Sequence, residues 1–447
     1  MNSANVNIKD YERLLSIEQS LLKALRLDSE YWYISGMQVD MGDVPYFSSD
    51  PDVPTIVTDT SELPTLSLGN VLIDVSYKHG LRHVCPSCNG LMSVNKWIRN
   101  VFSNPPIFGM STSIGVSVPQ LHCSHCSGYP QVRCPLVVHN HTFTKLCKFD
   151  MLGALAVQTV SDTVRSCRVG RSVVEDVLKE TVEDGKSRQD LSGVDTIFLD
   201  EIQSTHGQNY ISMFADQEHR CICGTLGHDI QAVRDGTADM VARGLDPAKV
   251  KLVSADMSRA YKAGCAECFP KSKLVIDRFH ILKGCNEAVD RARKRIVREM
   301  KADGVQPPGK VKYTVLYRRK NLDEKHSSRL EEIRVFAPKL ALAFDLKEEF
   351  FEIFERCWNR QNARSAFFSW YNRVRGSGIS ELQEFSGHMI VRLNEILRCF
   401  DHAITNAVSE GMNNKYKKIK SAAYGFRKPE NLIDMCMFRM GRLPIRI

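Results

Sequence analysis

KLVSADMSRAYKAGCAECFPKSKLVIDRFHILK, residues 251–283, contains two short apolar runs, and each run ends on an aspartate, Asp256 or Asp277. The composition of both runs is typical of buried strands, and the segment between them is typical of a helix. A carboxylate is costly to remove from water, so an acid at the end of a buried strand needs a physical reason. The segments upstream supply one.

Upstream, the sequence predicts three consecutive strands and then a helix, at 194–202, 209–218, 220–228 and 229–244. Downstream, a long helix is expected from His280. Three strands followed by alternating helices and strands is the βββαβαβα order of a ribonuclease-H-like α/β fold. The first and fourth strands are neighbours in such a sheet. We therefore expect Asp200, at the end of the first strand, to meet Asp256, at the end of the fourth.

Two carboxylates a few ångströms apart repel each other, so this pair predicts a site for a divalent cation. Phosphoryl transfer with two metal ions generally takes a third carboxylate, and the candidate is Glu410. A helix from Ser409 to Phe426 would place Glu410 on one face with Asn413 and Lys417, while Met412 would point to the core. An acid beside amide and ammonium groups suits a metal site flanked by phosphate contacts.

Two further acids lie close to this pair in the sequence. Glu201 follows Asp200 directly, so strand alternation predicts that it points to the opposite face, outside the site. Asp277 fits two roles. It is either a cap or turn residue, or a residue that supports the metal site by pairing with Arg278 or His280.

Two Cys-x-x-Cys pairs, in HVCPSCNG at 83–90 and LHCSHCSG at 121–128, have the spacing of a tetrahedral zinc site. The expected ligands are Cys85, Cys88, Cys123 and Cys126. The residues close enough in sequence to replace one of the second pair are Cys134, His122 and His125. The alternatives are buried free thiols without an ion, or a redox pair, which would call for a surrounding βαβ pattern that this sequence lacks.

Residues 161–184, SDTVRSCRVGRSVVEDVLKETVED, predict two short helices separated by a turn at 168–170. This pattern resembles a helix-turn-helix, whose second helix would present Arg171 to a DNA groove. An ordinary helix pair that packs against a neighbour is the alternative.

Charge is unevenly distributed along the 447 residues. Residues 1–80 hold five basic and twelve acidic side chains, whereas 291–330 hold thirteen against four and 411–447 hold nine against two. Basic blocks of this kind favour a polyanionic partner, with solvated helix faces as the alternative. The amino terminus does not resemble a signal peptide, no run is long enough to cross a bilayer, and fifteen cysteines without a secretory signal favour reduced thiols. We expect a cytoplasmic protein.

These patterns predict six segments. They are an amino-terminal α/β segment with an acidic loop at 41–64 (1–82), a zinc-binding domain (83–148), a helix-turn-helix (149–190), the first part of a catalytic domain (191–290), a helical insertion (291–405) and the last part of the catalytic domain, which carries the glutamate (406–447).

Several motifs of the sequence resemble motifs of one known family, and they occur in the same order as in that family. They are FLDEI at 198–202, the stretch from Val253 to Arg293, LYRRKNLDE at 316–324 and TNAVSEGMNNKYKKIKSAAYGFRKPEN at 405–431. The chain is similar, from about residue 20 onward, to transposases of the ISL-three type of bacterial insertion sequence. The CPSC pair ahead of a helical segment also fits this family.

This resemblance implies a DDE recombinase in which Asp200, Asp256 and Glu410 bind Mg²⁺, as two ions for which Mn²⁺ could substitute. It implies hydrolysis at the element ends, followed by attack of the freed 3′-hydroxyl on target DNA. The zinc motif and helix-turn-helix would bind the terminal inverted repeats. The protein would act at the bacterial nucleoid as at least a dimer, since two DNA ends must be held together. The expected DNA contacts are Arg171, Lys417, Lys418, Lys420 and Arg427.

Trp370, in the predicted helical insertion, has two possible uses. It could stack on a base unpaired near the cleavage point, or it could pack in the core. Two other functions are open for the whole chain. One is a ribonuclease-H-like nuclease that cuts DNA without joining it, and the other is a domesticated DNA-binding protein without catalysis.

Overall fold

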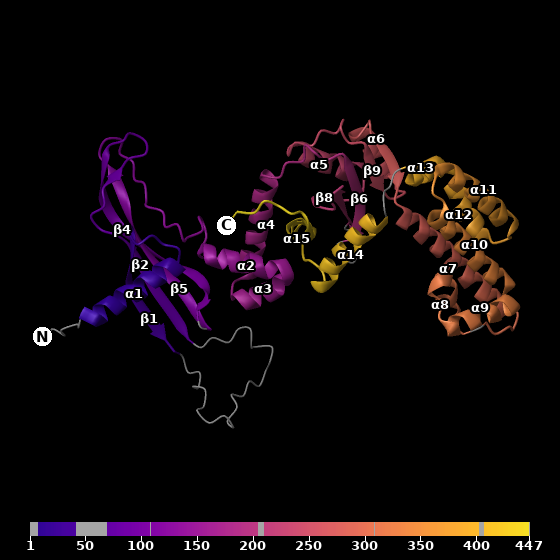
Figure 1. Cartoon of the computed structure of the whole chain (residues 1–447), viewed down its shortest axis with the longest axis horizontal. Coiled ribbons are helices and arrows are strands. Elements are labelled where there is room, and N and C mark those ends of the chain that lie inside the picture. The colour runs from indigo at the N-terminus through magenta and orange to yellow at the C-terminus, as the bar shows by residue number, and fades with distance from the viewer. Residues whose placement is uncertain are drawn as a thin grey trace, which may run out of the picture. The chain divides into compact units, whose positions relative to one another are not determined.

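The computed structural model describes residues 8–41, 69–107, 109–203, 210–307, 309–401 and 406–446, apart from the side chains of 8–15 and 406–410. The acidic loop expected at 41–64 lies outside the described residues, except for its first position. The chain forms two compact units, which are described separately below: residues 1–181 with 445–447, and residues 182–444 (Figure 1).

The first unit is built on a five-stranded sheet. Its elements are α1 (Ile8–Ala24), β1 (Trp32–Asp40), β2 (Asn70–Tyr77), β3 (His83–Val84), β4 (Leu91–Ile107) and β5 (Met110–Cys123). The strand order is β1-β2-β5-β4-β3, with β2 parallel to β5 and the other pairs antiparallel. One helix, α1, and two strands, β1 and β2, precede residue 82 in the described residues, which agrees with the expected α/β character of this segment. The predicted division at residue 82 runs through this one sheet.

Three helices follow the sheet of the first unit. They are α2 (Lys145–Val157), α3 (Val160–Cys167) and α4 (Arg171–Ser187). Threonine side chains cap α2 and α3, where Thr144 accepts from the backbone N–H of Cys147 and Thr159 from that of Asp162. Arg168 ends α3 in the left-handed region, at φ 54°, and so makes the sharp turn into α4. The predicted helix–turn–helix arrangement of elements at 161–184 is therefore present.

The second unit begins with a mixed sheet and its helices, in the predicted order. The elements are β6 (Thr196–Gln203), β7 (Tyr210–Asp216), β8 (Cys221–Leu226), α5 (Ile230–Val241), β9 (Leu252–Ala255), α6 (Arg259–Cys268), β10 (Lys273–Ile276) and α7 (Arg278–Ala302). The strand order is β10-β9-β6-β7-β8. β6, β7 and β8 form an antiparallel meander, and β9 runs parallel to both β6 and β10.

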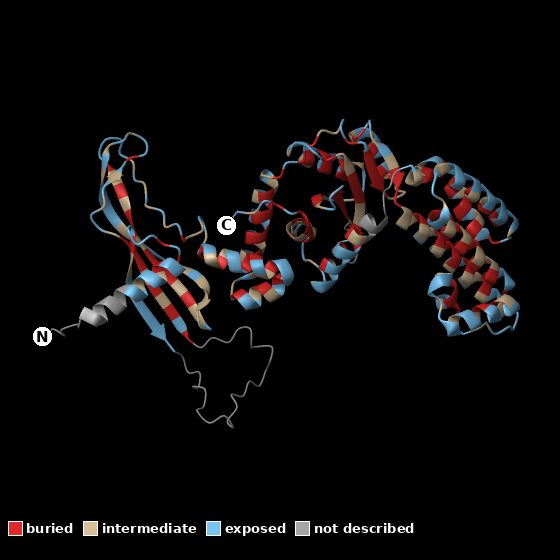
Figure 2. Ribbon diagram, viewed as in Figure 1, coloured by how far each residue is buried: buried red, intermediate tan, exposed pale blue. Residues whose placement is uncertain are grey.

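Helices cover both faces of this sheet. Successive strand residues point to opposite faces, and in β7 Phe214 packs close to Gly236 of α5, whereas Met213 lies by Gly224 and Ile433. Ile433 belongs to α15 (Pro429–Met440), and α14 (Asn406–Ala422) precedes α15 in the chain. The last segment of the chain thus returns to the sheet formed 200 residues earlier. Figure 2 shows the buried strands between exposed helix faces.

The region between α7 and α14 is helical, as predicted. It contains α8 (Val311–Leu316), η2 (Arg319–Asn321), α9 (Glu324–Phe336), α10 (Pro338–Arg356), α11 (Arg360–Gly376), α12 (Ser380–Val391), α13 (Leu393–Leu397) and η3 (Arg398–Phe400). These helices and α7 share one hydrophobic core, which extends to Ile276 of β10. The side chains of Arg398 and Cys399 donate hydrogen bonds to the β10 carbonyls of Leu274 and Ile276. No described helix meets the length and apolarity needed to span a membrane.

Candidate active site and metal centre

Three aspartates lie at one edge of the sheet. Asp256 and Asp277 directly follow the last residues of β9 and β10, whereas Asp200, which was expected at the end of its strand, lies inside β6. The last residue pair between β6 and β9 is Phe198–Ser254, so Asp200 and Asp256 both lie two residues beyond it. Asp277 directly follows the β9–β10 pair of Ala255 and Ile276, and its N–H donates to the Ala255 carbonyl at 2.8 Å. Parallel strands end at the same edge of a sheet, which is why residues so far apart in sequence meet here.

A cavity of about 470 Å³ opens at this edge. Its lining includes Asp200, Glu201, Asp256 and His280, so the two predicted aspartates share one space. Asp256 accepts a hydrogen bond from the N–H of Ser258 at 2.8 Å. This contact leaves other lone pairs of the Asp256 carboxylate free, and these lone pairs can bind a cation.

Asp277 is the N-cap of α7. Its Oδ1 accepts from the N–H of Phe279 at 2.8 Å, and the side chain is buried. It does not line the cavity, but its charge acts on His280. The cap role is therefore observed, and the cap holds the helix start that carries His280 beside Asp200.

The charges in the cavity perturb one another. Burial raises the pKa of Asp256, and the charge of Asp200 adds to this effect. Burial also raises the pKa of Glu201 and of Asp277. Burial alone would lower the pKa of His280, but the carboxylates of Asp200, Asp277 and Asp256 outweigh it and raise that pKa. Carboxylic acids whose pKa is raised by burial and by neighbouring carboxylates are typical of functional sites.

Lysine and asparagine side chains line the same cavity as the acids. The cavity lining contains Lys283 of α7, and Asn413, Lys417 and Lys420 of α14. The Lys417 ammonium lies 5.7 Å from the ring centroid of Phe279, and Lys420 donates to the Gln203 carbonyl at the end of β6. Met412, Tyr416 and Ile419 are buried, as the predicted helix face requires. Glu410 belongs to α14, but its side chain lies outside the described residues.

The residues present fit a divalent cation. Oδ2 of Asp200 is buried and has no hydrogen-bond partner among the described residues, and neither has Nε2 of His280, which lies 3.4 Å from the other Asp200 oxygen. An unpaired buried carboxylate oxygen is costly, and a cation would satisfy it. Carboxylate oxygens are the ligands that Mg²⁺ and Mn²⁺ prefer.

Glu201 corrects one expectation. Strand alternation predicted that it would point away from the site, but it lines the same cavity as Asp200. The reason is that β6 continues past its last pair with β9, so the strand edge there is open and both residues border the hollow. The sequence prediction also missed the site position of Lys283, which nothing but its place one turn after Phe279 would have suggested.

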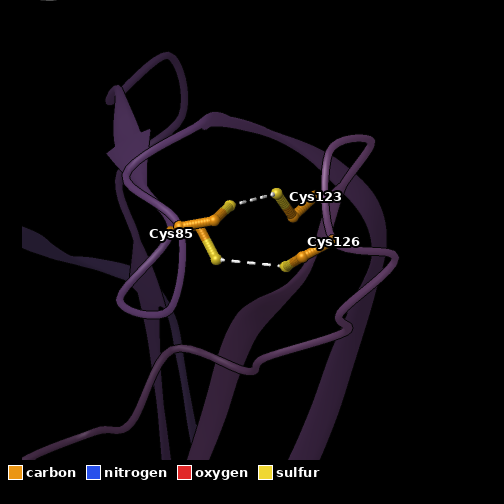
Figure 3. Close-up of side chains that lie close together, drawn as sticks. Cys85, Cys123 and Cys126 are labelled. Atoms are coloured by element: carbon orange, nitrogen blue, oxygen red, sulfur yellow. Dashed lines mark hydrogen bonds between the residues drawn. The ribbon is translucent and has the colours of Figure 1, made fainter.

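The four predicted cysteines meet at the tip of the first unit's sheet. The sulfur atoms of Cys85, Cys88, Cys123 and Cys126 all lie within 4.8 Å of one another. The Cys85–Cys126 and Cys88–Cys123 sulfur pairs are each 3.5 Å apart (Figure 3). A tetrahedral zinc with Zn–S bonds of about 2.3 Å places its sulfurs about 3.8 Å apart. The cluster therefore has the size of a metal site. Cys134, His122 and His125 do not belong to it.

Each pair forms the same knuckle. Asn89 and Ser127, the residues after the second cysteines, are in the left-handed region at φ 58° and 53°. The backbone N–H groups of Ser87 and Cys88 lower the pKa of Cys85, and those of Cys126 and His125 lower the pKa of Cys123. A metal binds thiolates, so backbone donors that favour the thiolate prepare the site.

The other predicted DNA contacts lie in several places. Lys418 and Arg427 are exposed and do not line the cavity. Arg171 forms an ion pair with Glu175 at 3.1 Å and donates to the Ser161 hydroxyl at 2.6 Å. Trp370 is buried in the helical core, where its Nε1–H donates to the Leu346 carbonyl at 2.8 Å. Of its two possible uses, core packing is the one observed, because aromatic neighbours surround the ring.

Comparison with known proteins now identifies the family. The family model for transposases of the ISL-three DDE type matches residues 197–436, more than half of the chain. The chain belongs to this family of transposases. It is 26% identical over 340 residues to the transposase for insertion sequence element IS1001 of Bordetella parapertussis, which covers 73% of this chain and 80% of that protein. It is 24% identical over 269 residues to the transposase for element IS1557 of Mycobacterium tuberculosis, covering 55% and 60%.

Membership makes this chain a DNA transposase of an insertion sequence and implies that it uses divalent metal. The matched residues begin inside β6 and end inside α15, so they span the cavity with Asp200 and Asp256 and the helical region. The cysteine cluster lies outside the matched residues.

Proposed function

We propose that this transposase cuts DNA at the ends of its insertion sequence and joins the freed ends to target DNA, with Asp200, Asp256 and Glu410 holding two magnesium ions. One observation carries the proposal. The buried Oδ2 of Asp200 has no hydrogen-bond partner among the described residues, and it lies in a cavity with Asp256 and a row of lysines. The order of strands supports a ribonuclease-H-like fold for the unit.

The proposed reaction has two steps, and each breaks one phosphodiester bond. In the first, water attacks the phosphorus at the element end, which leaves a 3′-hydroxyl and a 5′-phosphate. In the second, that 3′-hydroxyl attacks a target phosphodiester, and the target 3′-oxygen leaves. Two bound magnesium ions would activate the attacking oxygen and stabilise the leaving oxygen. The lysines opposite the acids are placed to neutralise the phosphates of the strand.

Helical spacing supports Glu410 as the third ligand. It lies three residues before Asn413 and seven before Lys417, and both of these residues line the cavity. Positions three and seven apart share one face of a helix. We therefore propose that Glu410 continues the row of α14 positions that line the cavity.

The first unit is proposed to recognise the element ends. The sulfur cluster supports a structural zinc ion on Cys85, Cys88, Cys123 and Cys126, and α3 and α4 support a helix-turn-helix. Each transposition event joins two ends, so at least a dimer is expected on DNA.

The test uses the full chain and a labelled duplex that carries one element end. Asp200→Asn, Asp256→Asn and Glu410→Gln should each lower the cleavage rate by about 10³-fold or more, since each removes a ligand charge. Their affinity for the duplex should stay within about twofold of wild type, because the acids make no favourable contact with phosphates.

Glu430→Gln is the matched control. Glu430 is an exposed acid in the first turn of α15, outside the cavity, and its loss should leave cleavage unchanged. If the three variants lost DNA binding and thermal stability together, the acids would be structural and the proposal would fail.

A further inference from the structure

A large hollow lies in the first unit, in addition to the cavity with Asp200 and Asp256 in the second unit. None of the functions proposed above involves this hollow. Its volume is about 850 Å³, and it lies between the β4–β5 hairpin and the segment that leads to α2. Phe102 and Val118 form part of an apolar floor. Six exposed polar side chains surround that floor, namely Asn100, Gln131, Arg133, His139, Asn140 and Lys145.

The charged side chains that line this hollow are all basic. Among the described residues, no aspartate or glutamate lines it, whereas the hollows beside α7 contain Glu287 together with Asp290 or Glu384. Lys145 is the first residue of α2, and the first turn of that helix contains no acid. The positive end of the helix dipole therefore adds to the charges of Lys145 and Arg133. His141 also lines the hollow, but it is paired with Glu180 at 2.9 Å.

The six rim side chains are exposed, and the charge of Lys145 acts on the Cys134 thiol. None of them forms a hydrogen bond or an ion pair through its side chain with the described part of the chain. By contrast, Arg99 on the same sheet is paired with Asp74 at 2.6 Å. A ring of unpaired cations and amides around an apolar floor has the composition of a ligand surface.

We infer that this hollow binds one strand of the duplex at the end of the insertion sequence. Arg133 and Lys145 would contact phosphates, and Asn100 and Asn140 would contact base edges. Arginine and lysine are the usual phosphate contacts, and asparagine and glutamine amides read adenine edges. An apolar floor suits the methyl group of thymine. The inference rests on the proposed function, because it takes the element end as the ligand.

The acid-free lining favours DNA over a basic partner, and the amides favour a sequence-reading contact over a target-DNA contact. The hollow also lies on the same sheet as the cysteine cluster. β4 and β5 contribute to the lining of the hollow, Cys123 is the last residue of β5, and Cys85 and Cys88 lie between β3 and β4. The β4–β5 hairpin would then present the hollow, and the cysteine cluster would hold the open end of that hairpin, where β4 begins and β5 ends.

Fluorescence anisotropy of the full-length protein tests the inference, with one duplex carrying the element end and one carrying the same bases scrambled. The double variant Arg133→Ala/Lys145→Ala should bind both duplexes at least tenfold more weakly at about 0.1 M salt. Its slope of log affinity against log salt should be shallower by about two, because two phosphate contacts are lost. Asn100→Ala/Asn140→Ala should bind the end duplex about fivefold or more weakly and the scrambled duplex as wild type does.

Lys23→Ala is the matched control, since Lys23 is an exposed cation of the same unit, in the last turn of α1. It should change both affinities by less than twofold. The inference is overturned if the Arg133/Lys145 variant binds like wild type, or if Lys23→Ala weakens binding as much. Thermal unfolding of each variant checks that a loss of binding is not a loss of folding. A wild-type protein that binds the end duplex without cutting it would count against the proposed function and leave this inference standing.

Discussion

At the scale of single residues, the site depends on where strands end. Asp200 and Asp256 could be predicted because each lies at the end of an apolar run, and the parallel pairing of β6 and β9 brings such ends together. Glu201 could not, because alternation describes a strand inside a sheet and not one that continues beyond its neighbour. The orphaned oxygen of Asp200 is a property of packing, which no sequence pattern reports.

Asp277 offers a residue-scale prediction. Asp277→Ala should lower the free energy of unfolding by about 1 kcal/mol, because it removes the side-chain acceptor at the start of α7. Asp277→Asn keeps an acceptor, so it should retain most of that stability and also the cleavage rate. Chemical unfolding and a cleavage assay check the two outcomes.

Asp229→Ala is the control for the loss of a cap, because Asp229 caps α5 and does not line the cavity. It should cost a similar stability and leave cleavage intact. A loss of cleavage in Asp277→Asn as large as that in Asp256→Asn would instead make Asp277 a metal ligand.

At the scale of elements, the helices and the second sheet could be predicted, but the β4–β5 hairpin could not. β4 contains Asn104, Pro105 and Pro106, residues that usually end a strand, and its burial does not alternate along its length. β5 also pairs in parallel with β2, which is more than thirty residues away in the chain. Such non-local pairing leaves no local sequence signal.

Lys347 links two elements of the helical region. Its ammonium is fully buried in α10 and donates to the carbonyls of Val315 and Tyr317, at the end of α8, at 2.8 and 2.5 Å. Burial lowers the pKa of Lys347 to about 8. The lysine therefore satisfies carbonyls that α8 leaves unpaired, at the cost of a buried charge.

The lowered pKa of Lys347 predicts how the free energy of unfolding depends on pH. Between pH 8 and about 10.5 the unfolded lysine keeps a proton that the folded lysine releases, so the unfolding free energy should rise with pH in this window. The rise should be on the order of 1–3 kcal/mol relative to Lys347→Met. Thermal unfolding of both proteins across the window measures it.

Lys339→Met, an exposed lysine on the same helix, supplies the control and should show no such trend. A difference between wild type and Lys347→Met that stays constant from pH 8 to 10.5 would show that the ammonium is not buried as described.

At the scale of the whole molecule, the two candidate metal sites lie in different units. The sulfur cluster lies in the first unit, and the carboxylate cavity lies in the second. Two compact units with their own cores should respond separately when one metal is removed.

Cys88→Ser should therefore lose one bound zinc per chain and lower the melting temperature of the first unit alone. Cys134→Ser, which alters a thiol outside the cluster, should keep both the zinc and the transition. Metal analysis by mass spectrometry and calorimetry check this. Equal zinc loss in both variants would mean that the cluster is not the zinc site.

The central claim is that Asp200, Asp256 and Glu410, which are far apart in the sequence, bind the same metal ions. The most direct measurement is the cleavage rate of Asp256→Cys in Mg²⁺ and in Mn²⁺, since a thiolate ligand disfavours Mg²⁺ far more than Mn²⁺. We predict that this variant binds the end duplex, is inactive with Mg²⁺ and regains cleavage with Mn²⁺. A variant that binds DNA but stays inactive with both metals, or that cuts equally well with Mg²⁺, would contradict the claim.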